Sequence, residues 1–381
     1  MNADVIIVGA GPAGSTCARL LADRKHRVLL LDRSRFPRDK PCGGWVNLKV
    51  FEEFPELEKL RNSLGPRDRL VEEPFRGLVF HNSDFSREAV FSSRGVVGYT
   101  VLRKQFDKHL LRLAAERDDY VQVVERQEVV AVEMGEQGVV AVTRSGRRFE
   151  GRILVGADGA HSTIARLTGL SEGWPADRQI VCLVKEIEVD GRTLDRTCGK
   201  QRKIHICIGY RGLAGYAWAF PKRNTINVGI GCRADAAPEL DAVYARWVAD
   251  LQRGGLLPEK AGAGKPVAGM VPAGGAIEYE GHVGKRVLLI GDAGGFVSAA
   301  SGEGIYPAML SARVAATCLD QALRAAQPQD VLMDFKFAWR QAFAEYIQMP
   351  NANLALLLPL IYDNQELCNR LAQCYLFGKN F

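Results

Sequence analysis

The chain has 381 residues, of which 47% are hydrophobic and 25% are charged, as is typical of a globular protein. This length predicts two interlocked domains, or one large α/β unit with an insertion. The net charge of +6 comes from 50 basic and 44 acidic residues, an excess too small and too dispersed to predict a nucleic-acid partner.

The N-terminal segment predicts a parallel βαβ unit. Residues 5–8 and 28–31 are continuous apolar runs, as in strands buried on both faces, and residues 13–23 between them are helix formers. Further elements are predicted along the chain: a helix at 103–116, a meander at 120–149, a buried strand at 153–155, an alternating antiparallel sheet at 178–231, a strand, turn and helix at 286–318, and helix from Pro328 to the end.

These elements predict an α/β fold with a Rossmann-like domain, an interleaved antiparallel sheet domain and a helical C-terminus. The expected boundaries are 1–75, 101–175 and 265–330 for the first domain, 76–100 and 176–264 for the sheet domain, and 331–381 for the C-terminal segment.

A glycine-rich turn joins the first strand to the first helix. Gly9 permits the tight turn, Gly11 lets the backbone approach a pyrophosphate, and Gly14 lets the helix pack on the strand. Asp32 ends the next strand, where its carboxylate can accept hydrogen bonds from ribose hydroxyls. The helix N-terminus adds amides and a partial positive charge, so the turn predicts a dinucleotide site.

Two later acids distinguish FAD from NAD. Asp158, followed by Gly159, and Asp292, preceded by Gly291, each come directly after a buried strand. Carboxylates at strand ends point into the crevice where an open α/β sheet binds ligands. Together with the N-terminal turn they predict an extended dinucleotide with a ribitol, which favours FAD.

Four segments resemble the geranylgeranyl reductase family of FAD-dependent oxidoreductases, which have the p-hydroxybenzoate-hydroxylase-like fold. They are residues 37–44 (PRDKPCGG), 103–107 (RKQFD), 216–221 (YAWAFP) with 229–231 (GIG), and 291–297 (GDAGGFV) with 302–305 (GEGI). The resemblance covers nearly the whole chain. One departure is Ala299-Ala300-Ser301, where members of the family tend to have Pro-Leu-Thr.

The resemblance implies that Arg103 and Asp292 contact FAD and that residues 302–305 pass close to its isoalloxazine. A helix that begins near Gly304 would direct its positive end toward the reduced flavin. The complete set of predicted FAD-binding residues is Gly9, Gly11, Pro12, Ala13, Gly14, Asp32, Arg33, Cys42, Gly43, Gly44, Arg103, Asp158, Gly159, Gly291, Asp292, Gly302, Gly304 and Ile305.

Tyr216, Trp218 and Phe220 alternate on one strand and therefore share a face. That face is either ordinary core packing or, as the family suggests, the wall of an apolar substrate cavity. Tyr216 is a candidate proton donor. Cys42 is the second candidate catalytic residue. Because no histidine or lysine partner can be assigned to activate its thiol as a nucleophile, we expect it to act through its size or polarity.

The predicted function is reduction of carbon–carbon double bonds in an isoprenoid, with hydride from reduced flavin and a proton from the protein or water. A flavin monooxygenase or halogenase of an aromatic or polyketide-like molecule is the alternative, and an FAD-bearing electron carrier is a third possibility. The Gly262–Gly264 pair lacks a flanking strand and helix, so no permanent NADPH site is predicted. NADPH or a reduced electron-transfer protein is therefore expected as a transient donor.

Cysteine and histidine usage predicts a reducing setting and no metal site. The nine cysteines form no CxxC pair, and the six histidines are scattered. No leader or membrane span is evident, so we expect a cytoplasmic protein, with peripheral association to a membrane if its substrate is a prenyl lipid. A basic cluster of Arg33, Arg35, Arg38 and Lys40 could contact an anionic lipid surface. The apolar residues Leu356, Leu357 and Ile361 either dip into the membrane interface or complete the core, and we expect the second.

Overall fold

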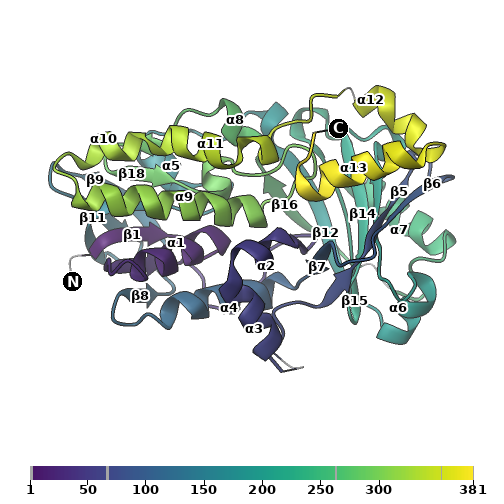
Figure 1. The fold of residues 1–381 in the computed structure, drawn as a ribbon, viewed down its shortest axis with the longest axis horizontal. Helices are drawn as coiled ribbons and strands as arrows, with labels where there is room; N and C mark the ends of the chain where they lie inside the picture. The colour runs from purple at the N-terminus through teal and green to yellow at the C-terminus, as the bar shows by residue number, and fades with distance from the viewer. Residues whose placement is uncertain (1–2, 66–67, 262–263, 353, 381) are drawn as a thin grey trace. The chain divides into compact units, whose positions relative to one another are not determined.

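The computed structural model describes residues 3–65, 68–261, 264–352 and 354–380 (Figure 1). It contains two compact units, each built from three separate segments. Unit 1 comprises Met1–Arg38, Asp107–Pro175 and Val271–Met349, and unit 2 comprises Asp39–Phe106, Ala176–Met270 and Pro350–Phe381. The pair at Gly262–Gly264 lies partly outside the described residues.

These units differ in extent from the predicted domains. Residues 39–75 belong to unit 2 rather than to the N-terminal unit, and the C-terminal segment is divided at 349/350. Tertiary packing explains the division, because α11 (Phe335–Ile347) packs on a helix of unit 1 while α13 (Gln365–Phe377) packs on the sheet of unit 2.

Unit 1 contains an eight-stranded sheet. The strands of its main path follow the order β17 (Val283–Gly284), β18 (Val287–Leu289), β11 (Arg148–Gly156), β1 (Ala3–Val8), β2 (Val28–Leu31) and β8 (Val121–Val124). Outside this path, β10 (Val139–Thr143) pairs with β11, and β9 (Val129–Met134) pairs with β10. β1 pairs in parallel with both β2 and β11, as the buried apolar runs predict. The carboxyl ends of these strands therefore meet at one edge.

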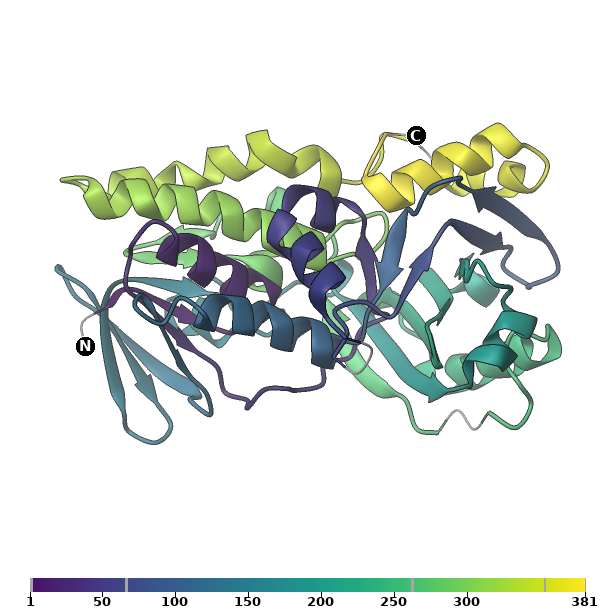
Figure 2. The ribbon, with the colours of Figure 1, turned by 60° about the horizontal axis from the view of Figure 1, so that its bottom comes forward.

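Helices of unit 1 cover this sheet (Figure 2). α1 (Pro12–Ala22) packs against the long helix α9 (Ile305–Arg324), which also contacts α10 (Pro328–Met333) and α11. The aromatic residues Phe335, Trp339, Phe343 and Tyr346 of α11 are all buried. The shorter helices are α5 (Thr163–Leu167) and α8 (Gly275–Glu278), and α4 (Arg103–Ala115) begins in unit 2 and continues in unit 1.

Unit 2 is built around a seven-stranded sheet. Its order is β16 (Val267–Val271), β12 (Ile180–Glu188), β15 (Thr225–Arg233), β14 (Gly215–Pro221), β13 (Ile204–Ile208), β5 (Gly77–His81), β6 (Glu88–Ser92). The antiparallel sheet predicted at 178–231 is confirmed, since β12 pairs with β15, β15 with β14 and β14 with β13 in antiparallel fashion. Outside that range, β5 joins the sheet in parallel with β13. The chain between β5, which ends at His81, and β13, which begins at Ile204, is long enough to allow either a parallel or an antiparallel pairing. The alternation of apolar residues along a strand does not reveal the direction of its neighbour.

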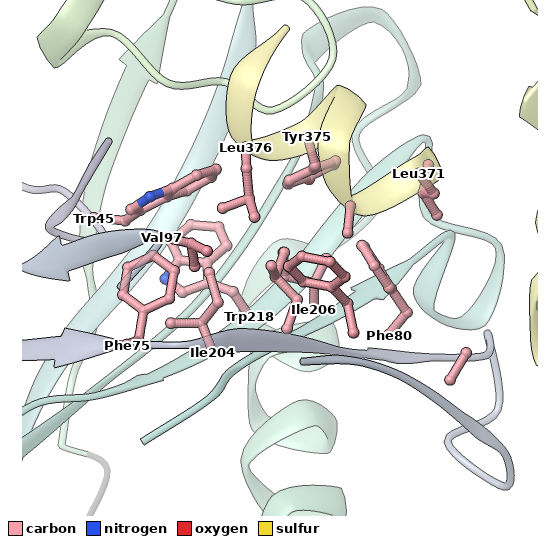
Figure 3. Close-up of a cluster of buried hydrophobic side chains, with 14 of the residues drawn as sticks. Trp45, Phe75, Phe80, Val97, Ile204, Ile206, Trp218, Leu371, Tyr375 and Leu376 are labelled. Carbon is pink, nitrogen blue, oxygen red and sulfur yellow. The ribbon is translucent and has the colours of Figure 1, made fainter. Parts of the chain in front are cut away.

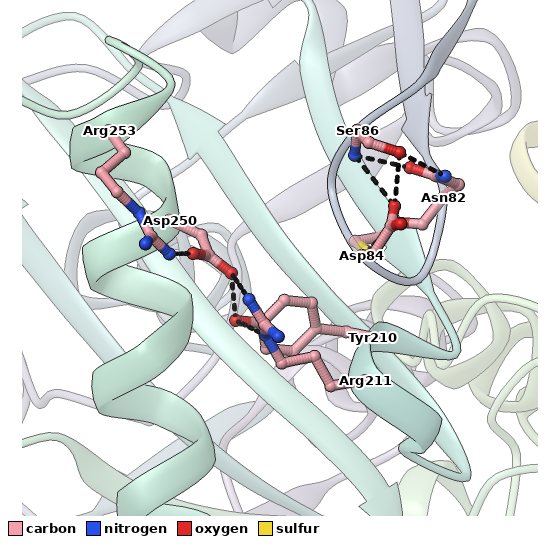
Figure 4. A network of polar contacts seen from close by, with 8 residues as sticks. Asn82, Asp84, Ser86, Tyr210, Arg211, Asp250 and Arg253 are labelled. Carbon is pink, nitrogen blue, oxygen red and sulfur yellow. Dashed lines mark hydrogen bonds and ion pairs between the residues drawn. The ribbon is translucent and has the colours of Figure 1, made fainter.

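The two faces of this sheet are covered by different helices. On one face, α7 (Leu240–Arg253) contributes Trp247, and its buried Asp250 accepts hydrogen bonds from Tyr210 at 2.6 Å and Arg211 at 3.0 Å and also contacts Arg253 (Figure 4). On the other face, α13 packs Leu371, Tyr375 and Leu376 against Phe80, Ile206 and Trp218 (Figure 3).

The remaining elements of unit 2 are short. They are the strands β3 (Trp45–Asn47), β4 (Glu73–Phe75) and β7 (Gly98–Thr100), which form a three-stranded sheet, and the helices α2 (Lys49–Glu53), α3 (Pro55–Ser63), α6 (Gly191–Thr197) and α12 (Leu354–Leu357). The C-terminal region is therefore not continuously helical after Pro328, because a non-helical segment follows α11 and Asn364 caps a new helix, α13.

The apolar residues of the C-terminal region differ in exposure. Ile361 is buried, as predicted, but Leu356 is 70% exposed and does not complete the core. No helix among the described residues is long and apolar enough to cross a bilayer.

Candidate active site

The glycine-rich segments of unit 1 lie in contact at the carboxyl edge of its sheet. A Cβ on Gly9 would stand 2.3 Å from Ala157 O, and one on Gly14 would stand 1.8 Å from Gly9 O. A Cβ on Gly291 would stand 2.9 Å from that of Ala13. The predicted cofactor-binding turns after β1, β11 and β18 are thus brought together, and glycine at these three positions permits the approach.

Asp32 ties the first turn to the end of β2. Its Oδ2 accepts a hydrogen bond from Ala10 N at 2.8 Å, and its Oδ1 accepts one from Ser34 N at 2.8 Å. The side chain is buried, so the carboxylate is fixed at the edge of the sheet. Arg33, beside it, is exposed.

Gly11 differs from its neighbours because its Cβ position faces a cation. Among the described residues outside its chain neighbours, the nearest heavy atom to that position is Arg38 Nη2, at 3.6 Å, and Arg38 in turn pairs with the fully buried Asp107 at 3.1 Å. Arg38 is absent from the predicted cofactor residues. The basic run at 32–40 was the available signal, but only the fold pairs it with Asp107 and places it over the turn.

The residues of unit 1 fit a dinucleotide. α1 and α9 both begin at a glycine N-cap with no side-chain cap and no acid in the first turn, so no acid of the first turn offsets the positive end of either helix dipole. Arg38 adds positive charge at the start of α1. When bound, FAD supplies redox chemistry that no side chain here provides.

Asp158 stabilises its own turn. The carboxylate accepts hydrogen bonds from Ser162 Oγ at 2.6 Å, Thr163 N at 2.7 Å and Ile164 N at 3.0 Å, and burial raises its pKa. It thereby holds the start of α5. A contact between Asp158 or Gly159 and the cofactor stays a prediction.

The segments that carry Asp292 and Gly304 also lie together. A Cβ on Gly304 would stand 3.2 Å from Asp292 Oδ1, and Gly302 has a φ of +69°, which favours glycine. Glu303, between the two glycines, is buried and bonds to Tyr346 Oη of α11. Sequence reasoning missed the bond between Glu303 and Tyr346, because it depends on how α11 folds back.

In unit 2, the predicted loop Cys42–Gly44 rests on the aromatic strand β14. A Cβ on Gly43 would stand 2.8 Å from the ring of Phe220 and 3.2 Å from Trp218 Nε1. Gly44 has a φ of +72°, and its Cβ would stand 2.3 Å from Val101 O. Arg103, at the start of α4, is buried.

The Gly-Ile-Gly segment of β15 makes room for the aromatic side chains of β14. Trp218 pairs with Gly229 and Tyr216 with Gly231 across the antiparallel strands. A Cβ on Gly229 would stand 2.1 Å from the indole, so the Trp218 ring lies directly over that glycine. The two halves of the predicted motif are therefore one packing unit.

Tyr216, Trp218 and Phe220 share a face, as alternation predicts. The ring centroids are 5.6 Å apart for Tyr216 and Trp218 and 6.1 Å for Trp218 and Phe220, and Tyr375 of α13 packs edge-on at 5.8 Å from Tyr216. Trp218 and Phe220 are buried in this cluster, so they have the packing role that was one of the two expectations. A role in lining a substrate cavity stays a prediction.

Burial shifts the acidities of the polar groups around Tyr216. It raises the pKa of the Tyr216 phenol well above its usual value, with the neighbouring Cys182 adding to the effect. It also raises the pKa of the Cys182 thiol to about 12. These groups are therefore protonated at neutral pH, and all nine cysteines are free thiols.

The FAD binding domain family matches residues 2–347 of the chain. The chain belongs to this family. The FAD-dependent class of enzyme and the choice of FAD over NAD are thus confirmed.

Two relatives extend the match along the chain. Digeranylgeranylglycerophospholipid reductase 1 of Methanopyrus kandleri is 31% identical and covers 94% of this chain and 91% of its own. Menaquinone reductase of Mycolicibacterium smegmatis is 29% identical and covers 94% of this chain and 85% of its own. The resemblance to geranylgeranyl reductases is therefore confirmed.

Solved structures confirm the fold class. A geranylgeranyl bacteriochlorophyll reductase-like protein from Thermoplasma acidophilum superimposes with a TM-score of 0.78 at 22% identity, covering 98% of this chain and 91% of that chain. The halogenase PltM, solved with phloroglucinol and FAD, superimposes with a TM-score of 0.72 at 15% identity, covering 98% of this chain and 80% of that chain.

Proposed function

We propose that the protein uses reduced FAD to saturate carbon–carbon double bonds in the isoprenoid chain of a lipid. The observation that carries this proposal is the full-length similarity to two reductases whose names specify a geranylgeranyl phospholipid and menaquinone. Both of those molecules carry isoprenoid chains. The packed unit formed by β14, β15 and the loop Cys42–Gly44 supports it, because it places a glycine-rich loop against an apolar aromatic cluster.

Tyr216 is our candidate proton donor to the alkene carbon that does not receive hydride. Its partly buried phenol keeps its proton at neutral pH because desolvation raises its pKa. An apolar surrounding also excludes water, which limits competing proton transfers. Cys42 is a candidate for a different role, in which the size or polarity of its side chain shapes the loop.

The electron donor is NADPH, acting transiently, or a reduced electron-transfer protein. The donor would reduce the flavin either before the lipid binds or by approaching the flavin from a side that the lipid does not occupy. Steady-state reduction with NADPH alone, compared with NADPH plus a ferredoxin and its reductase, distinguishes these donors.

Reduction of a lipid also implies contact with a membrane surface. Arg33 and Arg35 are exposed in unit 1, and Leu356 and Leu360 are 70% and 51% exposed in unit 2. Each basic residue near an anionic surface contributes about 1 kcal/mol, screened by salt. Co-sedimentation with anionic vesicles that weakens at high salt, and is reduced by R33Q/R35Q, would support peripheral association. Equal recovery in the supernatant at low salt would contradict it.

The decisive experiment is anaerobic turnover with chemically reduced protein. Geranylgeranyl phospholipid and a prenylated quinone would be offered in detergent, and products would be identified by mass spectrometry. A saturated product formed without oxygen supports the proposal. Strict oxygen dependence, or incorporation of halide into a phenol such as phloroglucinol, would instead establish the monooxygenase or halogenase alternative.

The Tyr216→Phe variant tests the proton donor. Loss of a positioned general acid typically lowers turnover by about 10²–10⁴-fold. Because the pKa of the phenol lies far above neutrality, its ionisation should cause no change in kcat of the parent protein between about pH 6 and 9. Tyr244→Phe is the matched control, since Tyr244 is buried on the α7 face of the same sheet. Equal kcat in Tyr216→Phe and Tyr244→Phe would exclude the role.

A further inference from the structure

A buried polar network lies beneath the loop Cys42–Gly44. Asn227 of β15 is 2% exposed, and its Nδ2 donates to the backbone carbonyl of Cys42 at 3.0 Å. Gly44 N donates to Cys42 Sγ at 3.3 Å, and Gly44 O accepts from Val101 N at 2.7 Å. The loop is therefore held by a side chain and a neighbouring strand end rather than only by its own residues.

The orientation of the Asn227 amide is determined by its partners. Trp218 Nε1, which can only donate, lies 2.8 Å from Asn227 Oδ1. The amide nitrogen must then face the other way, where its two hydrogens reach Cys42 O and Glu186 Oε2, the latter at 2.8 Å. One side chain thus satisfies an indole donor, a carboxylate and a backbone carbonyl.

Lys222 completes the network. Its side chain is 1% exposed, and its Nζ donates to Glu186 Oε2 at 2.8 Å and to Val101 O at 2.9 Å. Thr225 Oγ1 donates to the other carboxylate oxygen of Glu186. The cation neutralises a carboxylate that would otherwise repel the Cys42 carbonyl, so Asn227, Glu186 and Lys222 together favour a single loop conformation, while Thr225 bonds only to the far oxygen of Glu186.

We propose that Asn227 is a positioning residue that fixes the orientation of the Cys42–Gly43 peptide. In a planar trans peptide the carbonyl and the following N–H point in opposite directions. With Cys42 O turned toward Asn227, Gly43 N–H is turned to the opposite side of the loop. The network therefore presents a backbone donor and the Cys42 side chain in a fixed arrangement for ligands of the active site.

The proposed role of Asn227 rests on the proposed function only in experiments that measure turnover. The orientation itself has an independent readout, which is the reactivity of the Cys42 thiol. Six of the other eight cysteines are buried, and peptide mapping separates Cys42 from the partly buried Cys182 and Cys198.

The test compares Asn227→Asp with Thr225→Val in the FAD-loaded protein. Aspartate keeps the shape but removes the donor to Cys42 O and adds charge beside Glu186. Valine removes a hydrogen bond to the same Glu186 without touching the loop. For Asn227→Asp we expect kcat to fall by about 10²-fold, as for a small misplacement of reacting groups. We also expect Cys42 alkylation by N-ethylmaleimide to change by at least about tenfold, with FAD affinity within about threefold.

Thr225→Val should leave kcat, KM and Cys42 alkylation within about threefold of the parent protein. Trp218→Phe, which removes the donor that orients the amide, should change Cys42 alkylation in the same direction as Asn227→Asp and serves if that variant does not fold. Unchanged Cys42 alkylation in a folded Asn227→Asp or Trp218→Phe variant would overturn the proposal, as would equal losses of kcat in Asn227→Asp and Thr225→Val. A parent protein that reduces no prenyl lipid would refute the proposed function, while the alkylation result would still decide the role of Asn227.

Discussion

The two predicted cofactor loops, Gly9–Gly14 in unit 1 and Cys42–Gly44 in unit 2, use glycine for different reasons. In the first, Gly9 and Gly14 avoid backbone atoms of the same turn and of the adjacent strand end. In the second, Gly43 avoids the aromatic rings of β14, and Gly44 avoids the carbonyl of Val101. Backbone atoms alone thus constrain Gly9 and Gly14 most closely, whereas the second loop is constrained both by a backbone carbonyl and by aromatic side chains distant in sequence.

The largest effect should come from Gly14→Ala. The new Cβ would stand 1.8 Å from Gly9 O, a backbone atom that cannot move without opening the turn. We expect a loss of stability of about 3 kcal/mol or more, at the upper end for overpacking, together with loss of FAD. Urea unfolding of the apoprotein measures the first effect. A variant as stable as the parent would show that the turn is not locally constrained.

Gly11→Val should separate binding from folding in the same loop. Gly11 has φ −74° and ψ −169°, which an L-residue can adopt, and its Cβ would meet only the end of the Arg38 side chain. We expect FAD binding to be lost while the apoprotein keeps its stability within about 1 kcal/mol. FAD titration by fluorescence and urea unfolding give the two values. Unchanged FAD affinity would show that this turn does not bind the pyrophosphate.

Gly44→Ala tests the second loop. Its φ of +72° and the approach to Val101 O predict a destabilisation of about 1–3 kcal/mol. Displacement of the loop should lower turnover more than FAD affinity, because the phosphate turn belongs to unit 1. Gly95→Ala is the control, since its Cβ would meet no described atom within 4 Å. Equal stability of the two variants would contradict the constraint.

A buried histidine that bonds to the third glycine-rich loop, residues 291–295, predicts that the stability of the protein depends on pH. The fully buried His282 bonds through Nε2 to Gly294 O at 3.0 Å, and burial lowers its pKa to about 3 from 6.5. Below pH 6.5 this histidine takes up a proton in the unfolded chain but not in the folded chain. The free energy of unfolding therefore decreases as the pH is lowered from 6.5 to 3. The slope from this residue is at most about 1.4 kcal/mol per pH unit.

His282→Asn should reduce that slope, measured by urea unfolding at several pH values between 5 and 7.5. The exposed His161, changed to Asn, is the control and should leave the slope unchanged. The buried His81 and His205, whose pKa values are lowered to about 4 and about 3, contribute in both proteins, so only the difference between variant and parent is interpreted. An identical slope in His282→Asn and the parent would contradict the assignment.

Local patterns determined much of unit 1 from the sequence alone. The βαβ unit, the strand at 153–155 and the helix after Gly304 were predicted because buried parallel strands are continuous apolar runs and glycine turns have strict spacing. The positions of Asp32 and Asp292 at strand ends followed from the same rules. The aromatic face of β14 followed from alternation.

Tertiary structure decided what local patterns cannot encode. The parallel pairing of β13 with β5, the division of the C-terminal helices between the units, and the burial of Ile361 beside an exposed Leu356 all depend on partners distant in the chain. The pairing of Arg38 with Asp107 and of Asn227 with Cys42 depends on such partners too. A hydrogen bond between residues separated by 185 positions leaves no periodicity in the sequence, so only the folded chain reveals which polar side chain supports which loop.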